Sequence, residues 1–62
     1  MDVYITKTHG DYTHRDRTRS GDFWKVEFDG SRWTVPGSRP RKSVVEMVRN
    51  NLGYNARVWL AV

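Results

Sequence analysis

The chain has 62 residues, and its 11 lysine and arginine side chains against 7 acidic ones give a formal net charge of +4. This length fits a single small domain over residues 1–62 and excludes a two-domain architecture. The absence of cysteine excludes disulfides, thiolate metal sites and cysteine nucleophiles. No apolar run is long enough to cross a membrane, so we expect a cytoplasmic protein, and the excess of positive charge favours an anionic partner.

The N-terminal third divides into a strand and a polar segment. Apolar and polar side chains alternate over residues 3–8, with Val3 and Ile5 on one side, which predicts a first strand. Residues 9–21 contain one aromatic and no aliphatic side chain, so they add little to a core. We expect this segment to form a long polar loop or a partly mobile arm.

A β-hairpin is the clearest local feature of the sequence. Asp29-Gly30 separates two alternating segments and is typical of a type I′ turn, in which both central residues have positive φ. This turn fixes the register, so that Val26 faces Trp33 and Glu27 faces Arg32. The apolar pair then lies on one face of the hairpin, and the pair of opposite charges lies on the other.

A helix is predicted over residues 40–52. Its start is ambiguous, because Ser38 and Ser43 are both suitable capping residues, and Gly53 suits the cap at its end. The valines of this segment recur on one stripe, which makes the helix amphipathic.

The last predicted element is a strand over residues 56–62. Its apolar side chains fall on both faces, with Trp59 opposite Val58 and Leu60, so both faces need cover. One helix covers only one face of a small sheet, and we therefore expect a homodimer through this strand. In the alternative, Trp59 packs beneath segment 9–21 of its own chain.

The order of the predicted elements indicates an α+β fold. The fold has β-β-β-α-β order, with a small, mainly antiparallel sheet and one helix packed on one face. Over residues 3–8, 23–28, 32–35 and the helix, this order resembles the sheet-reading DNA-binding domains of the plant ethylene-response type and of some tyrosine-integrase N-termini. The resemblance implies a sheet face that enters the DNA major groove.

Catalytic motifs are weak in this sequence. His9 and His14 lie five residues apart with Asp11 and Asp16 nearby, a set that could ligate a divalent metal or act as acid and base. No helical or strand spacing positions these groups, and a solvated polar loop collects the same residue types. We therefore expect a protein that is not an enzyme, without catalytic residues, metal site or cofactor.

The basic residues form three candidate groups for contact with phosphates. One group precedes and begins the predicted helix, where the positive end of the helix dipole makes further cations unfavourable unless an anion binds. The other two lie in the polar loop and on the sheet face away from the core. The members are, in this order, Arg39, Arg41 and Lys42; Arg15, Arg17 and Arg19; and Lys25, Arg32 and Thr34. The alternative is that these charges are solvated and only keep the protein soluble.

The aromatic side chains divide into core and surface candidates. Trp24 and Trp33 share a face with valines, so we expect them beneath the helix. Phe23 lies on the opposite face beside cations, where it could stack on a base or pack against a protein. In the alternative, the fourth strand or the long loop covers Phe23. Phe23 and Trp59 are the candidate interface residues.

Two functions are consistent with these features. The first is non-enzymatic binding of nucleic acid, DNA in preference to RNA, through the basic groups. The second is implied by a resemblance: the chain is short, free of cysteine and rich in arginine and tryptophan, and in these features it resembles small accessory proteins of actinobacterial phages. That resemblance implies a modulator or inhibitor that binds a host protein, in the host cytoplasm.

Overall fold

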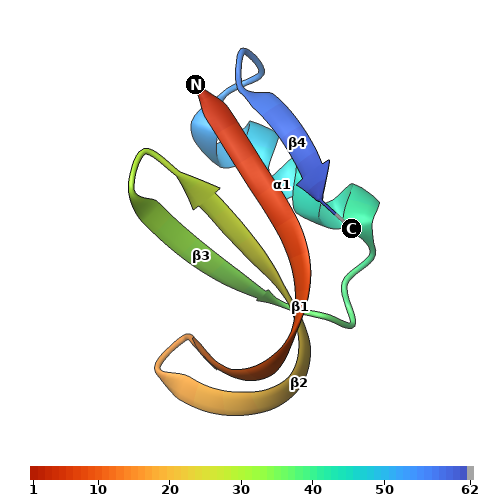
Figure 1. Ribbon diagram of the computed structural model, residues 1–62. Helices are drawn as coiled ribbons and strands as arrows, with labels where there is room; N and C mark the ends of the chain where they lie inside the picture. Colours follow the sequence, from red (N-terminus) through yellow and green to blue (C-terminus); the bar gives the residue numbers. More distant parts are fainter. Residues whose placement is uncertain (62) are drawn as a thin grey trace.

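The computed structural model describes residues 1–61, which form one four-stranded sheet and one helix (Figure 1). The elements in chain order are β1 (Asp2–His14), β2 (Arg17–Phe28), β3 (Ser31–Pro36), α1 (Arg41–Leu52) and β4 (Arg57–Ala61). The strand order is β3-β2-β1-β4, in which β4 runs parallel to β1 and the other pairs are antiparallel. The predicted α+β class and the β-β-β-α-β order are confirmed.

The β2–β3 hairpin has the predicted turn and register. Asp29 and Gly30 adopt φ values of 45° and 77°, as a type I′ turn requires. Val26 faces Trp33 and Glu27 faces Arg32. The turn residues and the alternating pattern therefore predicted the same register for this hairpin, and the structure has that register.

Segment 9–21 is not a loop, and the prediction for it was wrong. β1 and β2 continue as a hairpin up to a tight turn at Arg15 and Asp16, where both residues have positive φ. Cross-strand pairing runs along the whole segment, including Thr13 opposite Thr18. A two-stranded hairpin satisfies its own backbone hydrogen bonds, so it forms here without the aliphatic side chains that a core strand needs.

The far half of this hairpin curls over the sheet toward β3 (Figure 1). Nδ1 of His14 donates a 2.9 Å hydrogen bond to the carbonyl oxygen of Thr34, and the Thr34 hydroxyl donates a 2.6 Å bond to the carbonyl oxygen of Thr13. The ring of Tyr12 stacks on Phe23 with centroids 4.5 Å apart. These contacts hold the curled half of the hairpin against the sheet face opposite the core.

The core combines side chains from the other sheet face with side chains from α1. Its buried members come from β1, β2, β3, α1 and the residue before β4: Val3, Ile5, Val26, Val35, Val44, Val48 and Ala56. Trp24 and Trp33 are partly buried against this cluster, as predicted. Val44 and Val48 are the buried residues of α1, so the apolar stripe of the helix points into the cluster.

The ends of α1 differ in how they are capped. The helix begins at Arg41 after Pro40, and no side chain caps its first turn, so neither Ser38 nor Ser43 has the predicted role. At the other end Gly53 is the cap residue, as predicted, and its amide donates a 2.9 Å bond to the Arg49 carbonyl. Its φ of 98° and ψ of 157° lie outside the left-handed helical region that we expected for this cap. No helix within residues 1–61 is long and apolar enough to cross a membrane.

Candidate functional site

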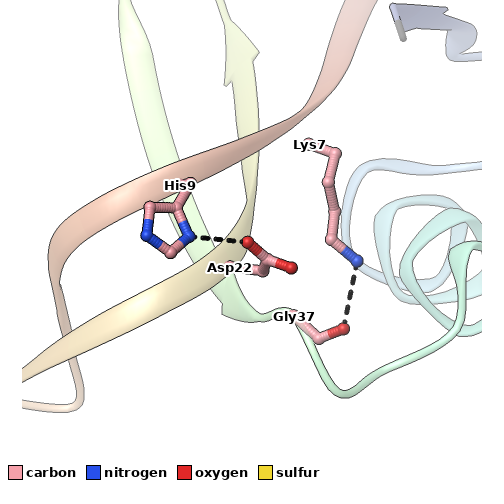
Figure 2. Close-up of polar contacts among 4 residues, drawn as sticks. All are labelled: Lys7, His9, Asp22 and Gly37. Carbon is pink, nitrogen blue, oxygen red and sulfur yellow. Dashed lines mark hydrogen bonds and ion pairs between the residues drawn. The ribbon is translucent and has the colours of Figure 1, made fainter.

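The segment that leads into α1 is fixed to the sheet at Gly37. The Gly37 amide donates a 2.9 Å hydrogen bond to the carbonyl oxygen of Asp22, and the Gly37 carbonyl accepts a 3.2 Å bond from Nζ of Lys7 (Figure 2). A Cβ atom at Gly37 would overlap the backbone of Asp22. Glycine is therefore required where this segment passes β2.

Trp24 holds the same segment one step closer to the helix. Its indole Nε1 donates a 2.9 Å hydrogen bond to the carbonyl oxygen of Arg39. Nζ of Lys7 lies 4.5 Å from the centroid of the Trp24 ring, in cation–π geometry. Lys7 and Trp24 thus position each other and, through their bonds to Gly37 and Arg39, the segment that leads into α1.

A hollow of about 530 Å³ opens beside this arrangement. Its lining combines three cations, one indole and the end of β4: Lys7, Trp24, Gly37, Ser38, Arg39, Pro40, Arg41, Leu60 and Ala61. Arg39 and Arg41 are exposed, and Lys42 follows them on the first turn. That turn contains no acidic residue and no capping side chain, so no side chain of the turn offsets its positive dipole end beside these cations.

Lys7 is a member of this site that the sequence analysis missed. The β1–β2 register brings Lys7 directly opposite Trp24. That register is set by the β1–β2 hairpin, whose far half, residues 9–21, was predicted to be a loop. A search for a turn at Arg15-Asp16 would have provided the register and with it the position of Lys7.

The hairpin arginines lie away from the start of α1 (Figure 1). Arg15 occupies the turn with φ of 52°, whereas Arg17 and Arg19 follow on β2. All three are exposed. Arg17 and Arg19 therefore share one face of β2, and the structure does not bring this group together with Arg39, Arg41 and Lys42.

The predicted residues of the open sheet face come together beneath the curled hairpin. Lys25, Arg32 and Thr34 line a hollow of about 420 Å³ together with Asp11, Tyr12, Thr13 and Phe23. Nζ of Lys25 lies 3.5 Å from Oε1 of Glu27. This hollow carries charges of both signs.

The two candidate interface aromatics have opposite environments. Phe23 is only 7% exposed, because Tyr12 stacks on it, so its assignment to an exposed interface was wrong. Trp59 is 52% exposed on β4, and its Nε1 donates a 3.3 Å bond to Oδ1 of Asp2. The 9–21 segment thus covers Phe23 and leaves Trp59 accessible.

The two histidines are engaged in separate contacts. Nδ1 of His9 donates a 2.8 Å bond to Oδ1 of Asp22 (Figure 2), whereas His14 bonds to the backbone of Thr34. Within residues 1–61 no three or more histidine, cysteine or acidic side chains are grouped so that they could hold a metal ion.

Comparison with protein-family models, with curated proteins and with solved structures finds no match for this chain. The resemblances in element order and in composition remain predictions.

Proposed function

We propose that the protein is a non-enzymatic nucleic-acid-binding protein that contacts phosphates at the start of α1. The observation that carries this proposal is the hollow beside Trp24, where Lys7, Arg39 and Arg41 surround an uncapped helix N-terminus. Three cations beside the positive end of a helix repel one another and the dipole unless an anion is bound. A phosphate removes this repulsion.

The groups at this site match the chemistry of a phosphate. Guanidinium groups donate paired hydrogen bonds to phosphate oxygens, and free amides of a first helical turn donate further ones. Lys7 adds an ammonium group that Trp24 and the Gly37 carbonyl hold in position. In this proposal the exposed Arg17 and Arg19, which lie apart from the start of α1, supply additional phosphate contacts of their own.

The test is the salt dependence of binding by a variant that lacks the cluster. Replacement of Arg39, Arg41 and Lys42 by alanine should weaken DNA binding and reduce the logarithmic salt slope by up to about 0.9 for each duplex phosphate that the variant no longer neutralises. Arg49→Ala, which removes one charge at the other end of α1, is the control and should change the slope little. No binding by the unmodified protein at about 50 mM salt, or equal slopes for both variants, would contradict the proposal.

A protein partner is the second candidate, and the exposed Trp59 and Leu60 on β4 favour it. Such an interface depends on apolar burial, so its affinity would change little with salt. A modulator of a host protein would therefore bind its partner after nuclease treatment and at high ionic strength. Binding to nucleic acid would instead be lost after nuclease treatment and strongly weakened at high ionic strength.

A further inference from the structure

The sheet face opposite the core carries a pair of exposed aromatic rings at its β4 end. Tyr4 and Trp59 are register partners in the parallel β1–β4 pair, so their side chains project from the same face. They are 51% and 52% exposed. The hydrogen bond from Trp59 Nε1 to Asp2 fixes the orientation of the indole without covering its ring.

Cations accompany these rings on the same face. Arg57 precedes Trp59 by two residues on β4, and Arg32 lies on β3. Glu27 lies near Lys25 and Asp2 accepts the Trp59 bond, whereas Arg32 and Arg57 form no ion pair with any carboxylate of residues 1–61. The guanidinium groups of Arg32 and Arg57 are therefore available to an anionic ligand.

Two hollows on this face have Arg32 as a common lining residue. One, of about 370 Å³, is lined by Tyr4, Glu27, Arg32 and the β2–β3 turn. The other is the hollow beneath the hairpin, which Arg32 also lines. Trp59, Tyr4, Glu27 and Arg32 are successive register partners across the four strands. We call this row the track, and at its Arg32 end it adjoins the hollow beneath the hairpin.

We propose that this track binds a single strand of nucleic acid, with bases stacked on Tyr4 and Trp59 and phosphates at Arg32 and Arg57. The inference rests on the proposed function and specifies its substrate. Exposed aromatic rings stack on the flat faces of unpaired bases, which a duplex does not present. The curled hairpin also covers part of this face and prevents the sheet from entering a major groove, which is only about 12 Å wide.

A second copy of the chain is a less suitable occupant of this face. A two-fold interface brings the same patch of each subunit together. Each copy would bring Arg32 and Arg57, which form no ion pair within residues 1–61, into this interface, and like charges brought near one another oppose association. The negative charges of a phosphate backbone would compensate the positive charges of both arginines.

The experiment measures the affinity of a labelled 12-nucleotide oligodeoxythymidylate and of a 12-base-pair duplex by fluorescence anisotropy at about 50 mM salt. The variants are Trp59→Ala, Tyr4→Ala and Trp59→Phe. Tyr54→Ala is the matched control, because Tyr54 is 74% exposed but lies after α1 and bonds to Asn50. Circular dichroism melts establish that each variant is folded, and Arg57→Ala tests the face without altering an aromatic residue.

We expect the single strand to bind more tightly than the duplex and to quench tryptophan fluorescence. Trp59→Ala and Tyr4→Ala should each weaken binding about tenfold, and Trp59→Phe should retain most of the affinity. Tyr54→Ala should have no effect.

Three results would overturn the inference. If the duplex binds as tightly and Trp59→Ala behaves like Tyr54→Ala, the track is wrong but the phosphate site at α1 stands. If neither probe binds, the proposed function fails as well. If light scattering gives a dimer that Trp59→Ala converts to a monomer, a second copy covers this face.

Discussion

Gly10 and Gly21 face each other across the β1–β2 hairpin, and both adopt positive φ, 149° and 129°. They lie between the flat part of the sheet and the half of the hairpin that curls back toward β3. Residues with a Cβ atom rarely adopt this conformation. The two glycines therefore allow the bend that brings Tyr12 onto Phe23.

Gly21→Ala should destabilise the protein through backbone conformation alone, because a Cβ atom at this position meets no atom within 4 Å. A residue held in such a region costs about 1–3 kcal/mol. In a domain of this size we expect the melting temperature to fall by at least about 4 °C. Nuclear Overhauser contacts between the Tyr12 and Phe23 rings should weaken in parallel.

Thr18→Ala is the control for this experiment, since Thr18 is exposed on the same strand beyond the bend. Its melting temperature should remain close to that of the unmodified protein. An unchanged melting temperature in Gly21→Ala, with intact contacts between the rings, would show that the bend does not depend on glycine.

Gly30→Val should also be destabilising, because Gly30 has φ of 77° at the second central position of the β2–β3 turn. A side chain in the left-handed region costs about 1–2 kcal/mol, and a β-branched one is least tolerated. Thermal melts should show a fall of at least about 4 °C. Gly30→Asn should lose much less stability, since asparagine tolerates this region; equal melting temperatures for both variants would contradict the assigned turn.

The sequence predicted those parts of the fold in which turn chemistry and hydrophobic pattern agree. Asp29-Gly30 specified both a turn and a register, and the apolar alternation around it specified the buried face. The far half of the β1–β2 hairpin has no alternating hydrophobic pattern, because Tyr12 is its only buried side chain. Arg15-Asp16 is also a less typical pair for positive φ than Asp29-Gly30.

The same difference explains which candidate site residues were found. Arg39, Arg41 and Lys42 are adjacent to the predicted helix start, so local pattern was enough to select them. Lys7 joins them only through its position opposite Trp24, which is a long-range relationship. The burial of Phe23 likewise depends on Tyr12, which is distant in the sequence and reaches Phe23 through the bend at Gly10 and Gly21.

Trp24→Phe should disturb the segment that leads into α1 while leaving the core stable. Phenylalanine retains an aromatic ring beneath Lys7 but cannot donate the 2.9 Å bond to the Arg39 carbonyl. Loss of one such bond costs about 0.5–1.5 kcal/mol, so the protein should remain folded. Because Arg39 is then less well positioned, the amides of Gly37 and Arg39 should exchange hydrogen faster and DNA affinity should fall. Trp33→Phe, a change at a core-packed tryptophan on the neighbouring strand, is the control; if both variants bind DNA equally well, Trp24 has no role in positioning the phosphate site.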